Sequence, residues 1–260
     1  MRMEVREFVF LNRNGKRMPA TLRIPEGTVR GTMVLMHGLA AWKEQPTILV
    51  IANAIVRAGY QVLTFDGADA LRGPDASYWS STTSGFIEDL EDVLAYCTQQ
   101  DWHKLPLALA GHSLGALCVV HYARQHPGVV SKLVLVAPAI SWRIDRSDRM
   151  IDRIRWTMKV VRIVKKKEQE IGEKFFNPLY PPWILDYFKY DTRKDAPHVH
   201  VPALIVSAGD DLIVAGPKAQ AALTRLFPDA TQVVVPHASH IFHEHEKELT
   251  DTITQWLSSS

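Results

Sequence analysis

The sequence around Ser113 constrains the fold of this chain more than any other feature. Residues 111–115 are Gly-His-Ser-Leu-Gly, preceded by the apolar run 105–110 and followed by the helix-forming sequence Ala-Leu-Cys-Val-Val-His-Tyr-Ala-Arg. A strand, a sharp turn and a helix are therefore predicted to meet at Ser113, because the two glycines let the strand and the helix approach closely. Its hydroxyl is expected at the exposed apex of the turn, where it is placed to act as a nucleophile.

Two later strands are predicted to end in groups that a serine nucleophile needs. Residues 202–214 form a buried-strand pattern that reaches Asp210 and Asp211, and residues 231–240 form a strand that reaches His237 and His240. A nucleophilic serine requires a base to accept its proton and a carboxylate to orient that base. The order serine, acid, histidine is the order expected of a nucleophile-elbow fold.

A fourth segment lies upstream, where an apolar strand at residues 31–36 ends in His37-Gly38-Leu39. With these four motifs in order, the chain resembles the α/β-hydrolase superfamily over nearly its whole length. The loop His-Gly-Leu-Ala-Ala-Trp-Lys-Glu at 37–44 is similar to those of feruloyl- or cinnamoyl-type esterases and of serine hydrolases of the monoacylglycerol-lipase kind. The resemblance implies an α/β fold with a mostly parallel central sheet, helices on both faces and a helical cap inserted after the sixth strand.

The resemblance also implies roles for individual residues. Ser113 is the expected nucleophile and His240 the expected base, with His237 as the alternative. Asp211 is the expected acid because, as in the family, one variable residue and two β-branched residues follow it; Asp210 is the alternative.

Two backbone N–H groups are expected to bind the oxyanion, those of Leu39 and Leu114. His37 is expected to stabilise its loop, and His112 to be a packing or loop residue beside the nucleophile.

Strand and helix patterns alternate along most of the chain. Residues 4–11 and 19–24 flank Asn14-Gly15, which predicts a hairpin because both turn positions favour positive φ. Strands are then predicted at 31–36, 60–65, 105–110 and 132–136, with helices at 46–58 and 84–99. The apolar runs are continuous rather than alternating, which indicates a parallel sheet that is covered on both faces.

The alternation stops between residues 141 and 197, and this segment is predicted to be a cap inserted into a core made of residues 1–140 and 198–260. Its second half is rich in aromatic side chains, and we expect some of them to contact substrate: Phe175, Phe176, Tyr180, Trp183 and Tyr187. The alternative is that these residues only pack the cap onto the core.

Composition and the lack of matching motifs give no support for several other classes of protein. The 260 residues suit one large domain, and 30 basic against 28 acidic residues, with no recognition motif, give no support for nucleic-acid binding. The chain has no signal-peptide pattern, no stretch near the roughly 20 apolar residues of a membrane span, and two isolated cysteines. These features predict a cytoplasmic enzyme. The segment 143–167 holds ten Lys or Arg against three Asp, so peripheral contact with an anionic membrane is an alternative to a solvated helix face.

The predicted function is hydrolysis of a small-molecule carboxylic ester through an acyl-enzyme intermediate, without cofactor. No metal is expected, because the histidines at 240–245 and 198–200 match no metal-binding pattern. The same machinery is compatible with thioester or amide (including peptide) hydrolysis, and the fold is also used by non-catalytic binding proteins. The sequence leaves the oligomeric state open.

Overall fold

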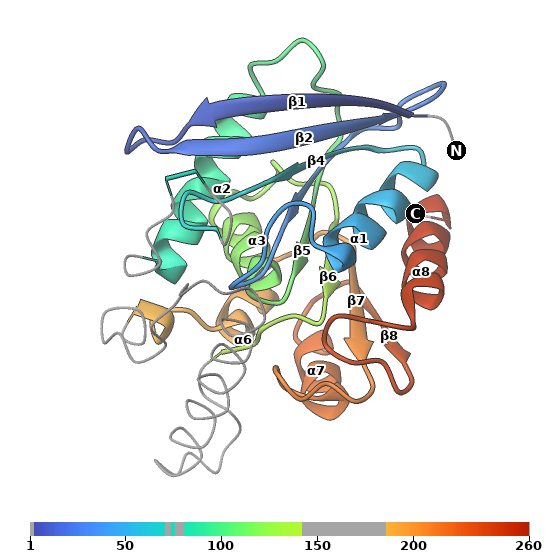
Figure 1. Ribbon diagram of the computed structural model, residues 1–260. Coiled ribbons are helices and arrows are strands. Elements are labelled where there is room, and N and C mark those ends of the chain that lie inside the picture. The colour runs from blue at the N-terminus through green and yellow to red at the C-terminus, as the bar shows by residue number, and fades with distance from the viewer. Residues whose placement is uncertain (1–2, 71–73, 76–80, 142–185, 260) are drawn as a thin grey trace.

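An eight-stranded sheet forms the centre of the computed structural model, which describes residues 3–70, 74–75, 81–141 and 186–259 (Figure 1). Across the sheet the strand order is β1-β2-β4-β3-β5-β6-β7-β8. The strands are β1 (Met3–Leu11), β2 (Arg17–Pro25), β3 (Thr32–Met36), β4 (Gln61–Phe65), β5 (Leu107–His112), β6 (Leu133–Val136), β7 (Ala203–Ala208) and β8 (Ala230–Val235).

The sheet begins with the hairpin that Asn14-Gly15 predicted. Strands β1 and β2 pair antiparallel from Met3↔Pro25 to Leu11↔Arg17, so residues 12–16 form the connection. Gly15 has a φ of 73°, whereas Asn14 does not have the positive φ that was expected of both turn positions. Strand β2 is also antiparallel to β4, and the strands from β4 to β8 are mutually parallel. The sheet is thus mostly parallel, as the continuous apolar runs indicated.

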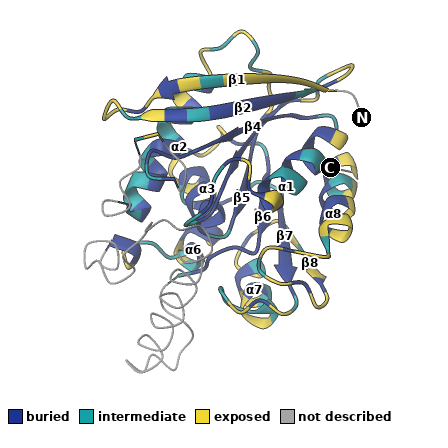
Figure 2. Cartoon of the chain, in the orientation of Figure 1, coloured by how far each residue is buried: buried dark blue, intermediate teal, exposed yellow. Residues whose placement is uncertain are grey.

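Helices cover both faces of the sheet, so the core is divided in two (Figure 1). On one face, α1 (Pro46–Arg57) packs against α8 (Glu246–Ser259); on the other lie α2 (Thr83–Cys97) and α3 (Leu114–Gln125). The central strands are buried along their length, as Figure 2 shows. Cys97 and Cys118 are buried within the α2–α3 layer. No helix in the described ranges has the length and apolar character needed to cross a membrane.

The chain reverses its direction of travel across the sheet at β3. Strand β4 lies on one side of β3, whereas β5, which follows later, lies on the other. In open α/β sheets, ligands bind outside the carboxyl ends of the strands at such a switch point. The segment after β3 contains Gly38 and the segment after β5 begins with Ser113, so both lie at this position.

Every strand and helix predicted before residue 141 is present, with ends that shift by a few residues. Three short elements were not predicted: α6 (Thr192–Asp195), the 3-10 helix η1 (Ala196–His198) and α7 (Pro217–Thr224). Most of the predicted cap lies outside the described residues. Its last part packs on the core: Asp186 accepts hydrogen bonds from the backbone N–H (2.7 Å) and the hydroxyl (2.7 Å) of Ser84, in the first turn of α2.

Candidate active site

Ser113 occupies a strained turn between β5 and α3. Its φ of 55° and ψ of −118° lie outside the ordinary regions for an L-residue, a condition that persists only where the surroundings enforce it. The flanking glycines make the turn possible. A Cβ on Gly111 would lie 2.5 Å from the Ala116 nitrogen, and one on Gly115 would lie 2.5 Å from the His37 carbonyl oxygen.

Hydrogen bonds on both sides fix this turn to the end of β6. The Ser113 N–H donates to the Val136 carbonyl (3.0 Å), and the Ser113 carbonyl accepts from the Ala139 N–H (3.0 Å). Leu114, the first residue of α3, has a backbone N–H of the kind that lacks an acceptor within its own helix. The serine and this N–H are therefore held in fixed relation at the carboxyl edge of the sheet.

Asp211 and His240 form a buried hydrogen-bonded pair on the loops that follow β7 and β8. The Asp211 Oδ2 lies 2.8 Å from the His240 Nδ1, and the two side chains are 0% and 12% exposed. The other oxygen, Oδ1, accepts the backbone N–H groups of Ile213 (2.8 Å) and Val214 (3.0 Å). Burial opposes ionisation of Asp211, but these hydrogen bonds outweigh it and lower the pKa of the carboxyl. An ionised Asp211 therefore accepts a hydrogen bond from the Nδ1–H of His240, which leaves Nε2 without a proton and free to act as a base.

The alternative residues lie on the surface. Asp210 and His237 have side chains that are 66% and 85% exposed, and Asp210 Oδ2 is 3.6 Å from His237 Nδ1. Backbone hydrogen bonds link the two loops, from Gly209 to Val235 (2.9 Å) and from Asp210 to Ala238 (2.9 Å). These bonds turn residue 210 outward and bring residue 211 against the loop that carries His240.

His112 connects the loop that carries His240 to the serine turn, a role that the sequence did not indicate. Its Nε2 donates to the carbonyl oxygen of His240 (3.0 Å), and the centroids of the two imidazole rings lie 4.8 Å apart. Because His112 directly precedes Ser113, this hydrogen bond ties the loop that carries His240 to the serine turn. The only signal in the sequence was that adjacency, which did not indicate a partner 128 residues away.

The loop after β3 packs directly on the serine turn. A Cβ on Gly38 would lie 2.9 Å from the Ser113 Cβ, so only glycine allows this approach. His37 is buried, its Nε2 accepts the Gly67 N–H (3.3 Å), and its Nδ1 therefore donates to the Gly38 carbonyl (2.8 Å). Burial lowers the pKa of His37, in agreement with this neutral form. His37 thus holds its own loop and that of Gly67 together.

The residues predicted to contact substrate are mostly outside the described part of the chain: Phe175, Phe176, Tyr180 and Trp183. Tyr187 is described, and it is 7% exposed within the core cluster of the α2–α3 layer. Its burial agrees with the alternative that it packs the segment onto the core. Within the described ranges, no group of three or more His, Cys, Asp or Glu side chains is arranged to hold a metal ion.

The site lies at one edge of a mostly parallel sheet, as in an α/β-hydrolase. It combines a strained serine in a strand-turn-helix, a buried Asp–His pair and a glycine loop. The family model described as serine aminopeptidase, S33 (Hydrolase_4) matches residues 27–173. This match covers more than half of the chain, and the chain belongs to that family. It is a hydrolase, and its similarity to this family and to two lipases supports serine-hydrolase, esterase-like function at the level of the family.

Two curated proteins are similar in sequence. The sn-1-specific diacylglycerol lipase ABHD11 of Mus musculus is 26% identical over 87% of this chain and 80% of its own length. The monoacylglycerol lipase of Mycolicibacterium smegmatis is 28% identical over 52% of this chain and 47% of its own length. Among solved structures, Est1E from Butyrivibrio proteoclasticus with bound ferulic acid superposes with a TM-score of 0.76, at 16% identity, over 97% of this chain and 98% of that one. This last likeness is one of fold.

Proposed function

We propose that this protein hydrolyses carboxylic esters through an acyl-enzyme intermediate, with Ser113 as nucleophile, His240 as base and Asp211 as the orienting acid. The observation that carries the proposal is the buried Asp211–His240 pair at 2.8 Å, which His112 ties to the strained serine turn. A neutral His240 keeps its proton on Nδ1, donates that N–H to the ionised Asp211, and presents Nε2 as the proton acceptor that serine requires.

In the proposed reaction, Ser113 Oγ attacks the ester carbonyl carbon and its proton passes to His240 Nε2. The negative charge that develops on the carbonyl oxygen is bound by the N–H groups of Leu39 and Leu114. His240 then gives its proton to the departing alcohol, which leaves Ser113 acylated. Water, deprotonated by His240, attacks the acyl-enzyme and releases the acid.

The two similar lipases favour acylglycerol esters as the substrate class, since both act on acylglycerols by name. The test is hydrolysis of p-nitrophenyl esters from acetate to palmitate and of a monoacylglycerol, with the unmodified protein beside Ser113→Ala. We expect turnover that the Ser113→Ala variant loses, with an optimum chain length that reports the depth of the acyl pocket.

A fluorophosphonate probe separates the mechanism from the substrate. Labelling that Ser113→Ala abolishes, together with hydrolysis of anilides but not esters, would overturn the ester assignment and retain the nucleophile. Absence of both labelling and turnover would overturn the catalytic proposal altogether and favour a binding protein.

A further inference from the structure

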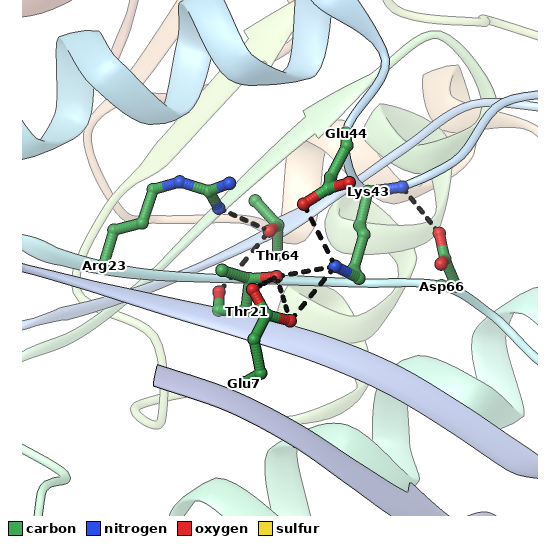
Figure 3. Close-up of polar contacts among 7 residues, drawn as sticks. All are labelled: Glu7, Thr21, Arg23, Lys43, Glu44, Thr64 and Asp66. Carbon is green, nitrogen blue, oxygen red and sulfur yellow. Dashed lines mark hydrogen bonds and ion pairs between the residues drawn. The ribbon is translucent and has the colours of Figure 1, made fainter. Parts of the chain in front are cut away.

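The loop that carries Leu39 is held at its far end by an unusual buried lysine. Lys43 follows Leu39 by four residues, and its side chain is only 10% exposed. Its Nζ donates to the Thr21 hydroxyl at 2.7 Å and lies 3.3 Å from a carboxylate oxygen of Glu7 and of Glu44 (Figure 3). A lysine is rarely buried unless it is paired, so these contacts indicate that Lys43 anchors its loop to the sheet.

The anchor is built on three paired strands of the sheet, β1, β2 and β4. Glu7 pairs with Thr21 across β1 and β2, and Thr21 pairs with Thr64 across β2 and β4, so the three form one row. The Thr21 hydroxyl donates to Glu7 (2.9 Å) while it accepts from Lys43. Paired strands move little relative to one another, so the row gives the lysine a rigid support.

The backbone of the same residue is bound separately. Asp66, directly after β4, accepts the Lys43 N–H at 2.6 Å, on the opposite side of residue 43 from the Nζ contacts (Figure 3). Burial raises the pKa of Asp66. At the near end, His37 accepts the Gly67 N–H, which adjoins Asp66. The loop from residue 37 to residue 43 is therefore fixed at both ends to the turn after β4.

Between these anchors the backbone is strained. Ala40 has a φ of 53°, a conformation that is unfavourable for a non-glycine residue and persists only where it is enforced. Ala40 is next to Leu39, and Gly38 touches the serine turn. If residue 43 is released, we expect the strain at Ala40 to relax and the Leu39 N–H to move relative to Ser113.

We propose that Lys43 and Asp66 are positioning residues that hold the Leu39 N–H in the geometry needed to bind the oxyanion. They act through the loop backbone and not on substrate. The inference rests on the proposed function, because it assigns Leu39 as an oxyanion donor. Loss of one such donor typically lowers the rate about 100- to 1000-fold, and a displaced donor retains part of its effect, so about a 10- to 100-fold loss is expected here.

The test uses Lys43→Met, which keeps the length of the side chain and removes the charge. Glu7 and Glu44 are 60% and 52% exposed, so their charges stay hydrated when the lysine is removed and the variant is expected to fold. Two rates are measured: kcat and KM for a p-nitrophenyl ester, and the rate at which a fluorophosphonate labels Ser113. In labelling, Ser113 Oγ displaces fluoride from phosphorus and its proton passes to His240, while the phosphonyl oxygen occupies the oxyanion position.

We expect kcat and the labelling rate to fall by the same factor, about 10- to 100-fold, while KM changes less than about threefold. Asp66 provides a matched pair: Asp66→Asn keeps a carbonyl oxygen to accept the Lys43 N–H and should retain most activity, whereas Asp66→Ala should lose it. Lys247→Met is the control, because Lys247 is 84% exposed and pairs with Asp251 on α8.

Suppose that the unmodified protein is labelled at Ser113 and that Lys43→Met and Asp66→Ala are labelled equally fast. That result would overturn this inference and leave the proposed function intact. The same holds if Asp66→Asn is as impaired as Asp66→Ala, or if the variants lose only thermal stability. Absence of labelling in the unmodified protein would overturn the proposed function and this inference together.

Discussion

The amide substitution Asp211→Asn gives the sharpest test of the proposed catalytic geometry, because the hydrogen bonds of Asp211 dictate how an asparagine must orient. Oδ1 accepts two backbone N–H groups, from Ile213 and Val214. An asparagine amide must place its carbonyl oxygen at that position, since its NH2 group would meet two donors. The NH2 group is then directed at His240 Nδ1, where the carboxylate oxygen lies at 2.8 Å.

A donor at that position forces His240 Nδ1 to accept, so the proton of the neutral imidazole moves to Nε2. A protonated Nε2 is unable to take the proton of Ser113. By analogy with the same substitution in serine proteases, the loss in kcat is about 10⁴-fold, equivalent to about 5.5 kcal/mol of transition-state stabilisation. Asparagine has nearly the same volume as aspartate, so we expect the unfolding temperature to change little although kcat falls strongly.

Two measurements check this reasoning. Ester hydrolysis at neutral pH gives the rate, and ¹⁵N chemical shifts of the His240 ring give the tautomer without any substrate. Asp210→Asn is the matched control and should remain near the unmodified rate, because the Asp210 side chain is 66% exposed. A D211N variant with unmodified kcat, or with the proton still on Nδ1, would refute the argument, as would a larger loss in D210N.

Three further predictions concern the fold around the site. Gly115→Ala places a Cβ within 2.5 Å of the His37 carbonyl oxygen, a backbone atom that has little room to move, and should lower the free energy of unfolding by about 1 to 3 kcal/mol; Gly216→Ala, with nothing within 4 Å, should change it by less than about 0.5 kcal/mol. Burial raises the pKa of Asp89 to about 6, above its value of about 3.9 in the unfolded chain, so the folded state binds the extra proton between these values and stability falls as pH rises through this window. The free energy of unfolding, measured with denaturant, should therefore rise by about 2 to 3 kcal/mol relative to that of Asp89→Asn when the pH is lowered from 7 to 4. If the difference between the two proteins is the same at both pH values, the pKa of Asp89 is not raised. Burial also raises the pKa of both cysteine thiols, that of Cys97 to about 12, so a maleimide should modify Cys97 and Cys118 only in denaturant; fast labelling of the native protein would show that the α2–α3 layer opens.

Much of the fold could be predicted because its signals are local. The apolar runs of the central strands, the Asn-Gly turn and the glycines around Ser113 each depend on residues adjacent in sequence. The unpredicted α7 shows the limit of such signals. It has only eight residues, of which Gln220 and Leu223 are buried, so it presents little apolar periodicity to find.

The choice between neighbouring candidates depended on the tertiary structure. Asp210 and Asp211 are chemically equivalent in the sequence, and a resemblance to a family favoured the second. In the structure, hydrogen bonds between the loops after β7 and β8 bury Asp211 against His240 and leave Asp210 exposed. Burial and pairing arise from both loops together, so neither segment alone determines them.

The sequence by itself determined the order of the motifs and predicted the type of chemistry, because a serine between two close-packing glycines, a later acid and a later histidine are properties of residue type and order. Only the tertiary structure decided which atoms meet. His112 reaches the carbonyl of His240, 128 residues away, and Lys43 reaches Thr21 and Glu7 across two strands. These contacts connect segments whose separation in space is fixed by strand order, and the residues themselves carry no mark of their partners.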